Sequence, residues 1–168
     1  MDNRVYSLRP LKPEDAPRMA QMMWDEQTTR YLQIGGPSYT LETALGFIAQ
    51  TKDESKHLHR AVVDDNDTYY GSISLKNIDR ENKEAEYAIS MHPEAQGKGI
   101  AAIATAKILE LAFQELGLSR VYLNVLVENQ RANKFYQKVG FHYTHSSTIL
   151  FKGEEKTLNW YAATNVTD

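Results

Sequence analysis

A run of six residues carries the first chemical signal in this sequence: Gln96, Gly97, Lys98, Gly99, Ile100 and Ala101. Two glycines around one lysine leave little side-chain bulk, so backbone N–H groups can approach a ligand closely. A strand-like segment precedes the run, and a helical pattern follows it over residues 99–116 and ends at Gly117. Unpaired amides and the helix dipole favour anions at a helix N-terminus, so the run predicts a pyrophosphate site. An ordinary loop that caps the helix explains these residues alone equally well.

Two other phosphate-binding motifs compete for the same run. Residues 97–102 satisfy the pattern G-x-G-x-x-A, and Glu128 follows the next predicted strand, as in a dinucleotide-binding βαβ unit. However, several residues, including Pro93, separate the first glycine from the preceding strand, and the rest of the chain is too short for the further βα units of that fold. A Walker A loop is excluded, because no Ser or Thr follows Lys98 with the required glycine spacing.

The composition limits the classes of function. The chain has 168 residues, of which 42% are hydrophobic, and its net charge of −3 gives no basic surface for nucleic acid. We expect one domain over residues 1–164 and a tail at 165–168. There is no membrane-spanning apolar run and no leader pattern, so we expect no membrane contact and a cytoplasmic location. The absence of cysteine excludes disulfides, thiolate metal sites and a covalent enzyme–cysteine intermediate, and the histidines show no metal-ligand spacing.

The apolar pattern predicts the elements that position the glycine run. We expect two early helices, one from Pro13 to about Asp25 and one capped by Thr40, with a loop at residues 35–37 that connects them or closes over a substrate. Strand patterns occur at residues 5–9, 59–63, 68–78, 83–91, 120–127, 141–151 and 156–162. Short turns make the three strands between residues 59 and 91 an antiparallel meander. The helix at 99–116 makes the strands before and after it parallel neighbours.

A second motif stands downstream of the glycine run. Asn129 is a predicted N-cap, and an apolar face of Ala132, Phe135, Tyr136 and Val139 follows before the helix ends at Gly140. The run at 96–101 matches Q/R-x-x-G-x-G/A. Together with the segment NQRANKFYQKVGF at 129–141, it resembles the two signature motifs of the GNAT superfamily of acetyl-CoA-dependent N-acetyltransferases. Residues 8–11, 14–16 and 85–89 are similar to those of its ribosomal-protein N-terminal and spermidine acetyltransferases.

This resemblance implies a fold and a co-substrate. The fold is α/β (α+β), with a mixed central sheet of about seven strands, an antiparallel N-terminal meander, splayed parallel fourth and fifth strands and about four flanking helices. Acetyl-CoA would lie between the splayed strands, with its pyrophosphate on the amides of residues 96–101. Its pantetheine arm would pair with the fourth strand near Ile89 and Met91. Asn129 would contact the same arm, although a plain N-cap is equally good chemistry for that position.

The implied reaction is attack of a primary amine on a thioester. Without cysteine, direct transfer in a ternary complex is the simpler mechanism, and a base must remove a proton from the amine. The resemblance places Glu86 near the amine as that base, while Glu84 on the same strand face and a water relay remain alternatives. Tyr136 matches the family tyrosine that gives a proton to the leaving thiolate. The alternative for Tyr136 is a core residue with a bonded hydroxyl.

The acceptor amine stays open between a small molecule and a protein N-terminus. Residues 20–57 balance their few acids with Arg30, Lys52 and Lys56, which does not favour a dedicated polycation site. Four aromatic residues are candidates for an acceptor pocket, although ordinary packing explains each of them: Trp24, Tyr31, Tyr39 and Trp160. The oligomeric state stays open, although a homodimer through an exposed strand or the C-terminal hairpin is common in folds that the sequence resembles. The alternative function is a non-catalytic acyl-CoA-binding or sensing domain, but such a domain would have no need of Tyr136 or Glu86.

Overall fold

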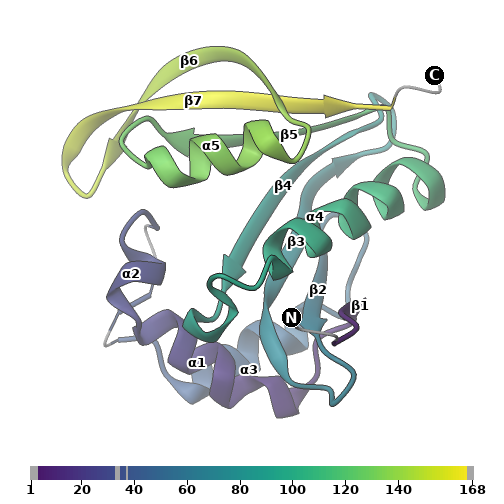
Figure 1. Ribbon diagram of the computed structural model, residues 1–168, viewed down its shortest axis with the longest axis vertical. Helices are drawn as coiled ribbons and strands as arrows, with labels where there is room; N and C mark the ends of the chain where they lie inside the picture. Colours follow the sequence, from purple (N-terminus) through teal and green to yellow (C-terminus); the bar gives the residue numbers. More distant parts are fainter. Residues whose placement is uncertain (1–3, 33–34, 37, 166–168) are drawn as a thin grey trace.

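The computed structural model describes residues 4–32, 35–36 and 38–165, and its centre is one mixed sheet (Figure 1). The seven strands lie in the order β1-β2-β3-β4-β5-β7-β6. Their bounds are Ser7–Arg9 (β1), Leu58–Val63 (β2), Tyr69–Asp79 (β3), Glu84–Met91 (β4), Arg120–Leu126 (β5), His142–Phe151 (β6) and Glu154–Thr164 (β7). The pairing of β4 with β5 is parallel and the other described pairings are antiparallel. The predicted meander and parallel pair are therefore confirmed.

The helices follow the predicted order with one addition. They are α1 (Ala16–Trp24), α2 (Glu26–Thr29), α3 (Leu41–Gln50), α4 (Ile100–Glu110), which continues as a π-helical turn at Leu111–Glu115, and α5 (Gln130–Lys138). The helix expected to run to about Asp25 is confirmed, since α1 ends at Trp24. Asp25 itself is extended and caps α2 by accepting a hydrogen bond from Thr28 N at 2.9 Å. The short α2 was not predicted. Gly35 and Gly36 lie in the predicted loop, whereas Pro37 lies outside the described residues.

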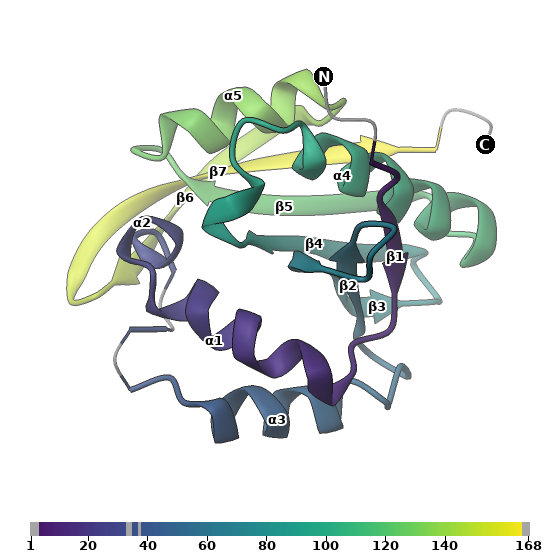
Figure 2. The ribbon, with the colours of Figure 1, turned by 60° about the horizontal axis from the view of Figure 1, so that its bottom comes forward.

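Two apolar cores cover the two faces of the N-terminal half of the sheet. Alternate residues of β2 point to opposite faces, so Val62 packs with Ile100 and Ile108 of α4, whereas Ala61 and Val63 join the core of α1 and α3. Figure 2 shows α4 and α5 on one side of the sheet and α1 and α3 on the other. No helix of the described residues is long and apolar enough to cross a membrane.

The sheet divides where β4 and β5 meet. These strands pair only between residues 84–86 and residues 120–122, after which they diverge, as Figure 1 shows. β5 instead stays paired with β7 along its whole length. The expected splay is therefore confirmed. The C-terminal half ends with Asn165, which was predicted to begin the tail but still donates its N–H to the Ser119 carbonyl at 3.0 Å. Residues 166–168 lie outside the described part, so the predicted domain limits stay a prediction.

Candidate active site

A groove of about 1090 Å³ occupies the gap between the two halves of the sheet. β4, β5, the start of α4, α5, the segment after α2 and the β6–β7 hairpin all contribute to its walls. Ten of the eleven predicted site residues line it: Glu86, Ile89, Met91, Gln96, Gly97, Gly99, Ile100, Ala101, Asn129 and Tyr136. The exception is Lys98, whose Nζ lies 5.7 Å from the centre of the Tyr70 ring. The groove thus brings together residues that lie as far apart in the sequence as Glu86 and Tyr136.

The glycine run forms an open set of backbone donors at the start of α4. Gly97 and Gly99 have φ angles of 75° and 71°, the left-handed conformation that glycine adopts without strain. Gly99 is the N-cap of α4, and Ile103 N is the first amide of that helix to donate, to Gly99 O at 3.3 Å. Within the described residues, no protein oxygen accepts a hydrogen bond from the N–H groups of residues 97–102. The N–H of Gln96, which was expected among the donors, is not open, because it donates to Pro93 O at 3.2 Å. This arrangement fits the diphosphate of a nucleotide cofactor.

The end of β4 offers an unpaired strand edge beside these donors. Beyond Glu86 the edge that faces β5 pairs with no strand of the described residues, so its amides and carbonyls can pair with an extended ligand. On its other edge β4 stays bonded to β3, where Met91 lies opposite Gly71. A Cβ at Gly71 would lie 2.5 Å from Ser90 O and 2.6 Å from Met91 Sδ, so this close approach requires glycine. Ile89 and Met91 both line the groove on this part of β4, and their contact with a cofactor stays a prediction.

Tyr136 combines a packed ring with a free hydroxyl. Its ring makes edge contacts with Tyr87 and Phe141, at centre distances of 5.7 and 5.8 Å. Among the described residues its hydroxyl has no hydrogen-bond partner, although the residue lines the groove. Burial raises the pKa of Tyr136 to about 12, so the hydroxyl keeps its proton over the whole physiological range. This is the state of a proton donor, and the catalytic role of Tyr136 stays a prediction.

The two candidate bases differ in their surroundings. Glu84 Oε2 lies 3.2 Å from Arg120 Nη1, and Glu84 does not line the groove. Glu86 lines the groove and accepts a hydrogen bond from the neutral amide of Asn77 at 3.1 Å. No cation of the described residues lies within ion-pair distance of Glu86. The structure thus favours Glu86 over Glu84 as a carboxylate that can meet an incoming amine.

Comparison with known proteins decides the family. Residues 6–142 match the GNAT acetyltransferase domain. The chain belongs to the GNAT acetyltransferase family. Spermidine N(1)-acetyltransferase of Escherichia coli (strain K12) is 32% identical over 139 residues, which cover 80% of this chain and 71% of that protein. The putative ribosomal N-acetyltransferase YdaF of Bacillus subtilis is 29% identical over 145 residues, covering 83% of this chain and 79% of the relative.

Solved structures support the fold independently. Spermidine N-acetyltransferase from Vibrio cholerae, in complex with CoA and spermine, superposes with a TM-score of 0.84 at 22% identity over 95% of each chain. A probable acetyltransferase reaches a TM-score of 0.85 at 24% identity, over 99% of this chain and 96% of its own. As a GNAT protein, the chain is an acetyl-CoA-dependent N-acetyltransferase that acts on an amine.

Sequence reasoning missed the residue that holds the second GNAT motif in place. Asn129 caps α5 as predicted, with Oδ1 accepting from Ala132 N at 3.3 Å. The buried Asn133 donates from Nδ2 to Asn129 O at 2.8 Å and to Leu126 O at 3.1 Å. Its Oδ1 accepts from the Tyr161 hydroxyl at 2.7 Å and from Asn159 Nδ2 at 3.0 Å. A polar residue one turn before Tyr136 was the available signal.

Two further polar contacts that the sequence did not reveal support the GNAT groove. Thr105, buried within α4, donates to Ala101 O at 2.8 Å and accepts from the Tyr87 hydroxyl at 2.8 Å. These bonds join the start of α4 to Tyr87, whose ring packs against Tyr136. His92 Nδ1 accepts from Glu94 N at 3.1 Å, and its Nε2 lies 3.2 Å from Gln21 Oε1. The His92 contacts fix the turn before the glycine run against α1.

Of the aromatic residues considered for an acceptor pocket, Tyr31 lines the groove. Trp24 is half exposed and donates to the Tyr39 carbonyl, away from the groove. Trp160 stacks on His145 with ring centres 5.4 Å apart. For Trp24, Tyr39 and Trp160, packing is therefore the better interpretation.

Proposed function

We propose that this enzyme transfers acetyl directly to one primary amine, of a small molecule or a protein N-terminus, with Glu86 as base and Tyr136 as acid. The observation that carries the proposal is the position of both groups in one groove. The Tyr136 hydroxyl has no described hydrogen-bond partner, and no described cation lies within ion-pair distance of Glu86. The open amides of residues 97–102 lie in the same groove.

The residues present fit acetyl-CoA, which supplies the acyl group as a reactive thioester. The amides of residues 97–102 would hold the diphosphate, and the edge of β4 at Ile89 and Met91 would pair with the amide-bearing arm. Asn129 would meet that arm from the opposite wall. Arg131 and Lys138 of α5 also line the groove and add positive charge for the anionic end.

The two proton transfers follow from the environments of the two groups. An alkyl ammonium must lose a proton before it can attack, and Glu86 can accept that proton directly or through water. The departing sulfur must gain a proton, and Tyr136, with a pKa of about 12, still carries one at any physiological pH. With no cysteine in the chain to hold the acetyl group, direct transfer with both substrates bound together is the simpler mechanism.

The test is the Tyr136→Phe variant, compared with Tyr143→Phe as a matched control. Tyr143 is 55% exposed on β6 and its hydroxyl meets Ser146 Oγ at 2.7 Å, away from the groove. Amine-dependent thiol release should fall by about 10²–10⁴-fold in Tyr136→Phe, the range for a lost acid. CoA affinity by calorimetry should stay within about twofold in both variants, because neither hydroxyl is needed for binding. Normal thiol release by Tyr136→Phe would overturn the role of Tyr136.

We also propose that the enzyme is a cytoplasmic homodimer. β6 is the last strand of the sheet, and its outer edge pairs with no described strand, which is the usual template for association. Light scattering on the purified wild-type chain and on the Thr148→Pro variant, which alters β6, tests the dimer. A monomeric wild-type chain would contradict it. Fractionation of cells that express the chain tests the location.

A further inference from the structure

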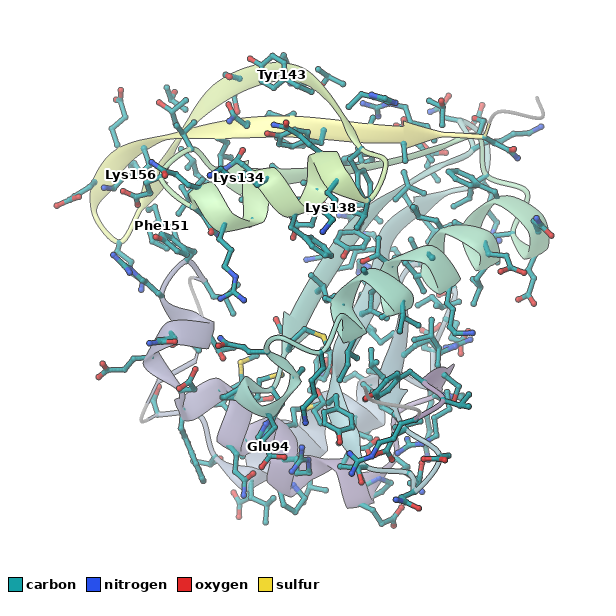
Figure 3. The ribbon with its side chains drawn as sticks, viewed as in Figure 1. Glu94, Lys134, Lys138, Tyr143, Phe151 and Lys156 are labelled. Carbon is teal, nitrogen blue, oxygen red and sulfur yellow. The ribbon has the colours of Figure 1, made fainter. Side chains whose placement is uncertain are left out.

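The side of the groove opposite α4 ends in an apolar surface that the proposed chemistry does not use. Five groove-lining residues form this mouth patch: Tyr31, Leu126, Ile149, Phe151 and Leu158. They belong to an apolar cluster separate from the two main cores, and they come from β5, the β6–β7 hairpin and the segment after α2. Figure 3 shows Phe151 beneath the end of the hairpin, on the side that faces α2.

The register of the sheet sets the distance from this patch to the proposed base. Tyr122 of β5 lies opposite Glu86 of β4. Tyr122, Asn124 and Leu126 share one face of β5, and Asn124 and Leu126 both line the groove. Leu126 lies four positions after Tyr122 along β5, so about 13 Å of strand separates the two residues. An acceptor with its amine at Glu86 would reach the mouth patch about 13 Å further along, with Asn124 between the two ends.

The charges around the groove do not suit a second cation at that far end. Glu86 and Glu128 are the described carboxylates that line the groove, and Glu128 already lies 3.3 Å from Lys156 Nζ. Lys152 Nζ lies 5.1 Å from the centre of the Phe151 ring, and the Arg30 guanidinium lies 5.3 Å from that of Tyr31. A positive group on the mouth patch would therefore meet several like charges and no free carboxylate of the described residues.

On the basis of the proposed function, we propose that the mouth patch binds an apolar group of the acceptor about 13 Å from its amine, and that the surrounding cations exclude a second positive charge there. The acceptor is then a monoamine with an apolar far end rather than a polyamine. Two sources share this chemistry, a peptide N-terminus with an apolar side chain at about its fourth extended residue and a long-chain alkyl amine.

Matched acceptors test the proposal and separate the two sources. One pair is the amidated tetrapeptides Ala-Gly-Gly-Phe and Ala-Gly-Gly-Arg, and the other is octylamine and its analogue with a terminal trimethylammonium group. In the pair that resembles the natural acceptor, we expect kcat/KM for the apolar member to exceed that for the cationic member by about tenfold or more. The kcat/KM for spermidine should be lower than that for the apolar member. Equal rates within both pairs, or spermidine as the best acceptor, would overturn the proposal. If no amine releases thiol although CoA binds, the proposed function itself fails.

Variants locate the preference on the mouth patch. Phe151→Ala should lower the apolar-to-cationic ratio of kcat/KM several-fold, while Leu150→Ala should leave it unchanged, because the neighbouring Leu150 is 71% exposed and does not line the groove. This ratio of kcat/KM values does not depend on how much of a variant is folded. Tyr31→Ala, at the other side of the mouth patch, should lower the ratio in the same way. Lys152→Glu should improve use of the cationic acceptors, whereas Lys52→Glu, outside the groove, should not. An unchanged ratio in Phe151→Ala and Tyr31→Ala would contradict the assignment.

Discussion

The two walls of the groove are built in different ways. The cofactor wall consists of backbone, namely the amides of residues 97–102 and the free edge of β4, and it is set by local conformation at Gly97 and Gly99. The acceptor wall consists of side chains such as Tyr31 and Phe151, which meet from segments more than a hundred residues apart. The first wall follows from a short motif, whereas the second requires the whole fold.

This difference separates what a family shares from what is particular to one member. Backbone donors at a helix N-terminus recognise a diphosphate whatever the neighbouring side chains are, so the same co-substrate can serve many sequences. The acceptor wall changes with each side chain that lines it. Lys76 faces the groove directly opposite Glu86 in the register of β3 and β4, a pairing that the sequence motifs do not report. Mutations on the cofactor wall should therefore change the affinity for CoA, whereas mutations on the acceptor wall should change kcat/KM for the amine.

The largest expected effect concerns the proposed base on the acceptor wall. Glu86→Gln keeps the side-chain shape but removes the basic group, so kcat/KM for the amine should fall by about 10²–10⁴-fold at pH 7. The loss should shrink at high pH, where the amine has already lost its proton. Glu84→Gln provides the matched control, because Glu84 pairs with Arg120 outside the groove. If Glu84→Gln reduced the rate as much as Glu86→Gln, the base would be misassigned.

The next largest effect concerns Asn133, which joins α5 to β5 and β7. Asn133→Ala would remove four side-chain hydrogen bonds, to Leu126 O, Asn129 O, Asn159 Nδ2 and the Tyr161 hydroxyl, at a cost of about 2–3 kcal/mol in the free energy of unfolding. CoA affinity should weaken as well, because the Asn129 backbone loses a contact. Urea unfolding and calorimetry measure both changes. The exposed neighbour Lys134 serves as control, and a Lys134→Ala variant with equal loss would show that any change in α5 suffices.

A smaller effect distinguishes backbone from side chain on the cofactor wall. Gly99→Ala must adopt a φ near 71°, at a cost of about 1–2 kcal/mol, which would weaken CoA binding by up to about tenfold. Lys98→Ala should change the affinity by less than about twofold, because the ammonium lies over the Tyr70 ring. Calorimetric titration with CoA compares the two. The reverse order would mean that the lysine side chain, rather than the amides, holds the phosphates.

The residues that the sequence predicted are those whose roles depend on near neighbours. Thr40 caps α3 through Thr43 N at 3.1 Å, and Asn129 caps α5, both within three residues of the cap. The parallel pairing of β4 and β5 followed from the helix between them. By contrast, α2 is too short to show an apolar period, and Asp25 with Thr28 gave its only local signal. The mouth patch and the partners of Asn133 depend on tertiary approach, so the patch has no signal in the sequence, and Asn133 has only that of a polar residue one turn before Tyr136.

The smallest expected effect is a pH dependence confined to the cofactor wall. Burial, followed by the charge of Arg18, lowers the pKa of His92 below its ordinary value of 6.5, while Glu94 and Asp25 oppose the shift. Below pH 6.5 the unfolded chain therefore binds more protons than the folded one, so the free energy of unfolding falls as the pH is lowered. Protonated His92 cannot accept the hydrogen bond from Glu94 N, and the loss of such a cap costs about 1 kcal/mol. The affinity for CoA should therefore fall by a few-fold as the pH is lowered.

The variant His92→Asn keeps a cap acceptor and removes the titration. The phosphate groups of CoA titrate near pH 6 as well, so the informative quantity is the difference between wild type and His92→Asn in calorimetric affinity from pH 7 to pH 5. His59 is the comparison from outside the groove. Burial lowers its pKa to about 4, so it should add to the pH dependence of unfolding but not to that of CoA affinity. If His92→Asn kept the full pH dependence of affinity, the turn before the glycine run would not depend on a neutral His92, and the cofactor wall would rest on the amides alone.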